Sequence, residues 1–328
     1  MFQYIVKRTL VLIPLLLALS IVVFIIIQLP PGDYLTTYIN QLRSTGQEVT
    51  EDQINALKET YGFDQPMYVQ YYKWFTNLLQ GDMGYSFAHN RPVNTLVGSR
   101  LPATIAIAVA GMVLVWLIAF PLGFYSATHK YSFGDYAFTG ISFFGVSVPE
   151  FLLAIVLMYL YFLVTQNYAG GINSDAFIGQ PMSWAKFVDM LRHIWIPMLV
   201  IGVTGTAGLF KTFRANLLDE LTKPYVKTAR AKGLSNMRLL IKYPVRIALI
   251  PFISTVGWSM AGLISGQTVL AMVLSLPTVG PLLISALQNQ DMYLAGSIVF
   301  IMGTLSMLGT LLSDILLAVT DPRIRNSM

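Results

Sequence analysis

A basic loop lies between two long apolar segments and reads PYVKTARAKGLSNMRLLIKYPVRIALIP over residues 224–251. The cations within it are Lys227, Arg230, Lys232, Arg238, Lys242 and Arg246. The chain as a whole is apolar: 55% of its 328 residues are hydrophobic, 11% are charged, and the mean hydropathy is +0.62. This composition is typical of membrane spans rather than of a soluble core. Because charged side chains are costly in hydrocarbon, we expect the loop to lie outside the membrane.

Six apolar segments are each long enough to cross about 30 Å of hydrocarbon as a helix. They cover residues 9–29, 101–126, 143–165, 194–213, 247–274 and 293–319. The first follows Lys7 and Arg8, as a signal peptide would, but its apolar run is too long, and the residues that follow offer no cleavage site of small residues. The sequence therefore predicts an all-α integral membrane protein with six transmembrane helices, the first of them retained.

The distribution of lysine and arginine predicts the orientation of these spans. Six spans place both termini on the same side as the basic loop. Of the 21 lysine and arginine residues, 14 fall on that side and seven on the other. We therefore expect both termini and the basic loop to be cytoplasmic.

The chain is expected to divide into three parts. Residues 1–30 form the N-terminus and first span, residues 31–100 an extracytoplasmic helical segment, and residues 101–328 a five-helix core that contains the loop 214–246. In the second part, a capping box predicts a helix near 51–60, and Pro66 begins another that ends near Gly81. The second of these helices carries an aromatic cluster, which indicates either a lid packed on the helices or a docking surface for an external partner.

Sequence signals of catalysis are missing. The chain has no cysteine, no G-x-x-x-x-G-K-S/T phosphate-binding loop, no H-E-x-x-H and no G-x-S-x-G. The three histidines, His89, His129 and His193, are far apart in the sequence. We therefore predict no catalytic residue, no metal site and no cofactor on this chain, and the composition favours a conduit or scaffold over an enzyme.

Four residues within the predicted spans are candidates for a gate or a transport path: Glu150, Gly205, Gly262 and Gly266. Small residues permit close helix packing, so the glycines indicate either packing alone or faces that line a passage. Intramembrane acids are costly, and Glu150 therefore indicates either a structural hydrogen bond or a gate. A second acid, Asp314, is expected to pair with an arginine of the C-terminal segment, Arg323 or Arg325.

The basic loop itself is expected to fold as two short amphipathic helices. Thr222 is a candidate cap, Pro224 suits a first turn, and Gly233 suits the position after a helix end, which predicts a helix over 224–232, about 13 Å long. Ser235 is expected to cap a second helix that Pro244 stops. The residues that share an apolar face are Tyr225, Val226 and Ala229 in the first helix and Met237, Leu240 and Ile241 in the second. Either these faces lie on lipid headgroups, or they bind in a groove of a cytoplasmic partner.

The loop resembles the cytoplasmic loop of ATP-binding-cassette (ABC) importer permeases, in particular the B-type subunits of the oligopeptide/dipeptide branch. The segment that carries this resemblance consists of Tyr225, Val226, Lys227, Thr228, Ala229, Arg230, Ala231, Lys232, Gly233, Leu234 and Ser235. The same branch is resembled by YIVKR at residues 4–8, PGD at 31–33, GFDQP at 62–66, GDMGYS at 81–86 and DPRIR at 321–325. The chain departs from the usual pattern at Thr278 and Val279 and around Gln290.

The resemblance implies a type I ABC importer permease, located in the cytoplasmic (inner) membrane of a prokaryote, that carries oligopeptides or similarly sized solutes. It implies four kinds of partner besides the lipid bilayer: a second, homologous permease chain, two ATPase subunits that bind ATP and magnesium, and an extracytoplasmic solute-binding protein. It also implies that residues 225–235 couple the ATPase to transport. The same machine carrying oligosaccharides or opine-like solutes is an alternative, and an ungated channel or membrane scaffold is a more distant one.

Overall fold

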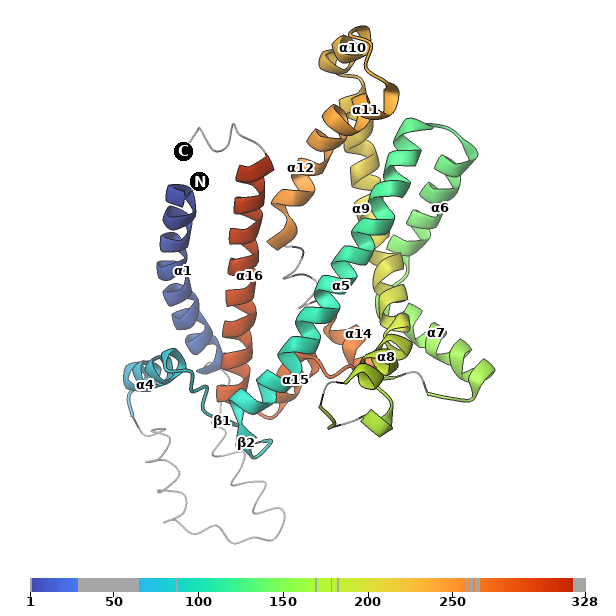
Figure 1. The fold of residues 1–328 in the computed structure, drawn as a ribbon. Coiled ribbons are helices and arrows are strands. Elements are labelled where there is room, and N and C mark those ends of the chain that lie inside the picture. The colour runs from blue at the N-terminus through green and yellow to red at the C-terminus, as the bar shows by residue number, and fades with distance from the viewer. Residues whose placement is uncertain are drawn as a thin grey trace. The chain divides into compact units, whose positions relative to one another are not determined.

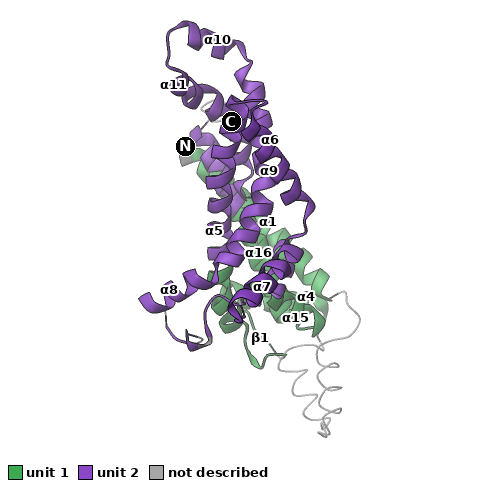
Figure 2. Cartoon of the chain, turned by 90° about the vertical axis from the view of Figure 1, so that its right-hand side faces the viewer, with its two compact units in different colours: residues 1–104, 278–308 green, residues 105–277, 309–328 purple. Residues whose placement is uncertain are grey.

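The computed structural model describes residues 2–28, 65–86, 88–168, 170–177, 179–181, 183–257, 259, 262 and 266–320. The chain is mainly helical, and two long helices, α5 and α16, run through both of its compact units (Figure 1, Figure 2). Unit 1 comprises residues 1–104 and 278–308, and unit 2 comprises residues 105–277 and 309–328. The helix expected near 51–60 lies outside the described residues.

Unit 1 is built from helices and one short hairpin. Its elements are α1 (Phe2–Gln28), α4 (Met67–Leu79), β1 (Tyr85–Ser86), β2 (Arg91–Pro92), the start of α5 (Val93–Thr128), α15 (Val279–Gln288) and most of α16 (Met292–Thr320). The two strands pair antiparallel, with Tyr85 opposite Pro92 and Ser86 opposite Arg91. Asn90, at φ 51°, adopts the left-handed conformation of the hairpin turn and accepts a hydrogen bond from the Tyr85 hydroxyl at 2.7 Å.

Close packing in unit 1 depends on glycines of α16. A Cβ at Gly296 would lie 2.7 Å from the Ile27 side chain, and one at Gly303 would lie 2.6 Å from that of Leu19, so both positions require glycine for α16 to approach α1. The aromatic cluster of α4 divides between two environments. Trp74 is buried beside Phe24 and Phe300, whereas Tyr68 and Tyr72 are exposed. One side of α4 therefore packs on the helices of its unit, as a lid would.

Asp291 connects two sequence motifs that are about 200 residues apart. Its buried carboxylate accepts hydrogen bonds from the Ser86 hydroxyl at 2.6 Å and from the Leu294 backbone N–H at 3.2 Å, so it holds the hairpin and caps the start of α16. Gly84, at φ +82°, lies against the ring of Tyr293, where a Cβ would approach to 2.9 Å. Burial raises the pKa of Asp291, although the bonds from Ser86, Leu294 and Ala88 oppose that rise.

Unit 2 contains the remaining helices. They are the rest of α5, α6 (Phe133–Ser147), α7 (Glu150–Thr165), a 3-10 turn η1 (Asp175–Phe177), α8 (Trp184–His193), α9 (Trp195–Leu221), α10 (Pro224–Ala231), α11 (Asn236–Leu240), a π turn η2 (Ile241–Val245), α12 (Arg246–Ser254), α14 (Thr268–Val273) and the end of α16. Ser132 caps α6 by accepting a bond from the Asp135 N–H at 3.2 Å, and Ser183 caps α8 in the same way from Lys186.

Among the described residues, four helices are long and apolar enough to cross a membrane: Gln3–Gln28, Val93–Thr128, Trp195–Leu221 and Met292–Thr320. A fifth span results if α6 and α7 are counted together. The expectation of one straight helix over 143–165 is wrong, because the chain bends by 100° between α6 and α7. Pro149 at this bend cannot donate a backbone hydrogen bond and disfavours a helical residue before it. The segment expected as one span over 247–274 contains α12 and α14, and part of it lies outside the described residues.

Candidate functional site

The loop between α9 and α12 holds α10 and α11 beyond the ends of the long helices of unit 2, at the top of Figure 1. Helix α10 begins at Pro224, where a missing N–H has no cost, and ends at Ala231, one residue short of the expected end. The expectation that Thr222 caps it is wrong: Lys223 is the N-cap, and no side chain bonds to the helix start. Gly233, at φ +78°, reverses the chain after the helix and donates its N–H to Arg230 O at 3.0 Å.

The apolar side of α10 is covered by its own loop. Val226 is 2% exposed and Ala229 is 7% exposed, and both pack on Leu239 of α11, which is fully buried. Tyr225 and Leu234 complete this contact as partly buried neighbours. The apolar face that we expected to be free for a lipid headgroup or a partner groove is therefore occupied inside the chain, and α10 and α11 form one packed unit.

The second short helix differs from its expectation. Leu239 is the buried residue of α11, whereas Met237 and Ile241 are 56% and 58% exposed. Ser235 is the N-cap, although its side chain makes no cap bond. Pro244 does not stop the helix: the chain passes through the π turn η2 directly into α12, because a π turn leaves room for a residue that lacks a backbone N–H.

The outward surface of the loop is polar and positively charged. The exposed residues of the segment are Lys227, Thr228, Arg230, Ala231, Lys232, Gly233 and Ser235. Arg238 and Lys242 extend this surface on α11 and η2. This polar surface, rather than the buried Val226 face, is the accessible side of the loop.

Acidic residues at the end of α9 fix the entry to α10. Lys223 Nζ lies 3.0 Å from Asp219 Oδ2, and the Tyr225 hydroxyl donates to Glu220 Oε2. Burial, with this hydrogen bond and the negative charges of Glu220 and Asp219, raises the pKa of Tyr225, so the hydroxyl stays protonated and remains a donor at neutral pH. The hydrogen bond to Asp219 likewise raises the pKa of Lys223.

Three aromatic rings join the long helices just before the loop. Phe213 of α9 lies 5.0 Å from Phe120 of α5 and 5.9 Å from Phe252 of α12, centroid to centroid, in edge-to-face arrangements. A Cβ at Gly123 would lie 2.7 Å from the Phe213 ring, so glycine allows α5 to approach it. Since α9 and α12 carry the two ends of the loop, this cluster gives α10 and α11 a fixed base.

A buried ion pair, which the sequence reasoning missed, fixes α6 to α9. Arg214 donates from Nε and Nη2 to the two carboxylate oxygens of Asp135, each at 2.7 Å, and the Tyr131 N–H also bonds to this carboxylate, at 3.0 Å. The Asp135 side chain is 3% exposed. The S-x-x-D pattern at Ser132 was the available signal, but it indicates only a helix start, and the partner lies 79 residues away.

The candidate path residues are not brought together. Glu150, at the start of α7, accepts a hydrogen bond from Thr204 of α9 at 2.9 Å. A Cβ at Gly205 would lie 2.8 Å from Val115, so Gly205 serves the packing of α9 on α5. A Cβ added at Gly262 or at Gly266 would meet no described atom within 4 Å, which leaves the role of these two glycines untested.

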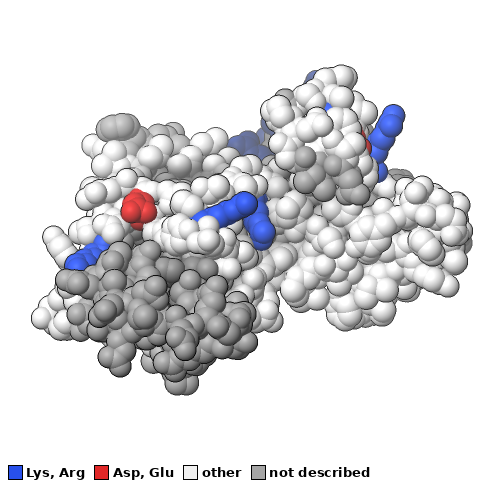
Figure 3. All heavy atoms as spheres, turned by 90° about the horizontal axis from the view of Figure 1, so that it is seen from below, with Lys and Arg blue, Asp and Glu red and all other residues white. Residues whose placement is uncertain are grey.

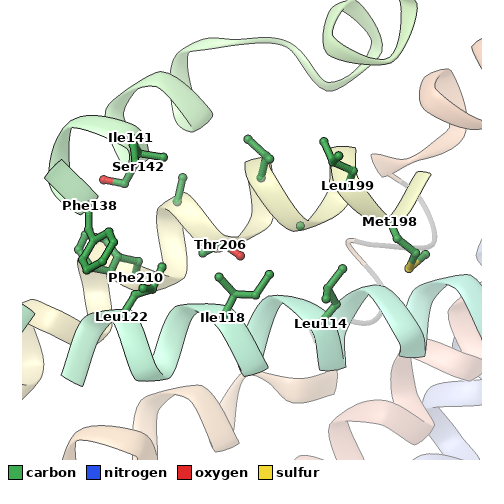
Figure 4. Close-up of a pocket in the computed structure, with 13 residues that line it drawn as sticks. Leu114, Ile118, Leu122, Phe138, Ile141, Ser142, Met198, Leu199, Thr206 and Phe210 are labelled. Atoms are coloured by element: carbon green, nitrogen blue, oxygen red, sulfur yellow. The ribbon is translucent and has the colours of Figure 1, made fainter. Parts of the chain in front are cut away.

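An apolar cavity of about 300 Å³ lies among α5, α6 and α9 (Figure 4). Its walls include Leu114 and Ile118 of α5, Phe138 of α6 and Phe210 of α9. Ser142 and Thr206 are polar residues of this lining. The Ser142 hydroxyl donates to the Thr139 carbonyl, whereas the buried Thr206 hydroxyl has no hydrogen-bond partner among the described residues. None of the four expected path residues lines this cavity.

No group of three or more His, Cys, Asp or Glu residues that could hold a metal ion occurs in the described part of the chain. Arg323 and Arg325, the expected partners of Asp314, lie outside it. At the end of α16, Arg246 donates a hydrogen bond to the Thr320 carbonyl at 3.1 Å, which joins the start of α12 to the end of α16.

Comparison with known proteins covers the whole chain. Residues 119–326 match the family described as binding-protein-dependent transport system inner membrane component, and residues 1–108 match its N-terminal family. The chain is 33% identical to the oligopeptide transport system permease protein AppB of Bacillus subtilis over 99% of both chains. It is 27% identical, again over 99% of both, to the dipeptide transport system permease protein DppB of Escherichia coli.

Proposed function

Because the chain belongs to the family of binding-protein-dependent transport system inner membrane components, we propose that it forms half of the translocation pathway of an ATP-driven importer for oligopeptides or similarly sized solutes. Relatives named as oligopeptide and dipeptide permeases, which align over nearly their full length, support this substrate class. Nothing in the described residues favours oligosaccharides, opine-like solutes or an ungated channel over this proposal.

The proposal includes the rest of the machine. A second, homologous permease chain completes the pathway, two separate subunits bind ATP with magnesium, and a solute-binding protein delivers the solute on the extracytoplasmic side. The chain crosses the inner membrane six times with both termini cytoplasmic, and the segment 31–100 lies outside. The distribution of lysine and arginine supports this orientation, since the α10–α11 loop is strongly basic.

We assign the coupling of ATP hydrolysis to transport to residues 225–235. The observation that carries this assignment is the packing of α10 on Leu239, together with the hydrogen bond that joins Tyr225 at its start to Glu220 of α9. A short helix held in this way moves with α9 and α12 as one body. A force applied by an ATPase to the exposed residues, such as Lys227 and Thr228, therefore reaches the spans.

The absence of native cysteines allows a direct test. Thr228→Cys places a thiol on the exposed side of α10, and Val226→Cys places one on the covered side. In the assembled complex, a bifunctional thiol reagent should join position 228 to an ATPase subunit much faster than position 226. Equal rates, or labelling of position 228 only by lipid-soluble reagents, would contradict the coupling role.

A further inference from the structure

Helix α8, at the opposite end of α9 from α10, exposes an apolar stripe. Trp184, Phe187 and Leu191 recur at a spacing of three or four residues and therefore share one side of α8, and Trp195, the first residue of α9, is exposed next to its end. Their exposed fractions are 78%, 36%, 52% and 40%. The helix extends to the side of the other helices of unit 2 (Figure 2). The described residues leave this apolar stripe without a covering partner.

The other side of α8 is fixed to the preceding loop. Asp189 accepts hydrogen bonds from the Ser174 N–H at 2.8 Å, the Ser174 hydroxyl at 3.0 Å and the Asn173 side chain at 3.3 Å. Lys186 Nζ donates to the Gln180 carbonyl at 2.6 Å. The helix cannot rotate to cover its apolar stripe without breaking these bonds, so the stripe faces outward as a consequence of the fold.

The stripe is continuous with apolar surfaces of the helices that carry the hydrophobic spans. Trp195 packs 5.8 Å from Tyr161 of α7, ring to ring, and Leu199, one turn further along α9, is 39% exposed. At the end of α7, Val164 is 84% exposed. Seen from this end of the chain, the described surface carries few charged side chains (Figure 3). An exposed apolar surface along α7 and α9 therefore continues onto α8.

We propose that α8 is an interfacial helix at the end of α9 opposite the α10–α11 loop. It inserts its apolar stripe into the bilayer at the boundary between the lipid headgroups and the acyl chains. Tryptophan prefers this level of a bilayer, and a helix with one apolar and one polar side lies in its plane. The stripe contains no charged residue, so lipid suits it better than a polar protein surface. The α8 anchor keeps one end of α9 at the bilayer surface while the other end follows the loop. The proposal does not depend on the identity of the solute.

The test uses the full chain, in which an introduced cysteine is unique. Spin labels at Leu191→Cys and Trp184→Cys are compared with one at Ala185→Cys, which is also exposed but lies to the side of the stripe. In nanodiscs of phosphatidylethanolamine and phosphatidylglycerol, molecular oxygen should relax the labels at 191 and 184 at least about threefold more strongly than a water-soluble nickel chelate does, as lipid contact requires. The label at 185 should instead be relaxed more strongly by the nickel chelate than by oxygen.

Two results would overturn the proposal. One is equal access of the nickel chelate at all three positions, which would place the stripe in water. The other is a label at 191 that becomes shielded only when the second permease chain or the solute-binding protein is added, which would make the stripe a protein interface. Far-UV circular dichroism of each labelled chain, matching that of the unlabelled chain, establishes that the helices are intact in all three.

Discussion

Helices α8 and α10 lie at the two ends of α9. Both are short and amphipathic, but they expose opposite kinds of side. In α10 the apolar side is buried on Leu239, and the polar side is exposed. In α8 the polar side is bonded to its own loop through Asp189, and the apolar side is exposed. Periodicity in the sequence identifies such a helix, but it does not say which side the chain covers. The side left exposed is the one a partner would meet, and our two proposals follow from it: an ATPase subunit at α10, where that side is polar, and lipid at α8, where it is apolar.

The largest effect is expected from a charge placed on the covered side of α10. Ala229→Asp would bury a carboxylate among the apolar side chains of Val226 and Leu239, which costs several kcal/mol and separates α10 from α11. Transport and solute-stimulated ATP hydrolysis by the reconstituted complex should fall to background, while the chain remains in the membrane.

Its matched control is Thr228→Asp, which adds the same charge one position away on the exposed side. This variant should keep α10 folded and lose only the part of the activity that depends on the positive surface. If Ala229→Asp retained normal transport, the packing of α10 on α11 would have no part in coupling. The difference between α10 and α8 in which side is buried would then not correspond to a difference in function.

A second large effect is expected at the ion pair that holds α6 to the loop end of α9. Arg214→Leu would leave the buried carboxylate of Asp135 without its partner, at a cost of about 3–5 kcal/mol. Thermal unfolding of the purified chain in detergent should show a clear drop in the midpoint. Arg214→Lys keeps the charge but loses the bidentate geometry. Its unfolding midpoint should therefore lie between those of the native chain and Arg214→Leu.

The control for that experiment is Lys223→Leu, which removes the exposed pair with Asp219. Exposed pairs add little to stability, so the midpoint should not change measurably. An unchanged midpoint in Arg214→Leu as well would mean that the pair of Arg214 with Asp135 does not stabilise the chain.

Much of this fold could be predicted from the sequence, and the failures have physical causes. The start and end of α10 could be predicted from Pro224 and Gly233, because proline and glycine determine the local backbone conformation whatever surrounds them. The buried role of Leu239 could not be predicted, since periodicity in a five-residue helix is too short to identify a face. The Asp135–Arg214 pair joins residues far apart in sequence. The bend at Pro149 was signalled by the proline, but the apolar run around it is equally consistent with one straight span.

A smaller effect is expected at the turn that ends α10. Gly233 has φ +78°, and a Cβ there would meet no described atom within 4 Å, so Gly233→Ala should cost only the strain of a left-handed alanine, about 1 kcal/mol. Amide hydrogen exchange in α10 should accelerate about fivefold. Gly208→Ala, at an open helical position without positive φ, should leave that exchange unchanged. Equal acceleration in both would argue against the turn as the source.

The smallest effect is expected at α8 and depends on pH. Burial opposes ionisation of Asp189, but the hydrogen bonds from Ser174 and Asn173 outweigh it and hold the pKa of this carboxyl below its usual value of 3.8. A lowered pKa contributes stability above the unfolded value and loses it as the pH falls through the folded one. At neutral pH, Asp189→Asn should therefore speed exchange of the Ser174 amide modestly, because a neutral acceptor binds more weakly than a carboxylate. As the pH falls below 3.8, the two proteins should converge once the rates are corrected for intrinsic exchange. A difference that persisted at low pH would mean that the charge of Asp189 does not hold the loop, and that α8 is free to turn its apolar stripe inward.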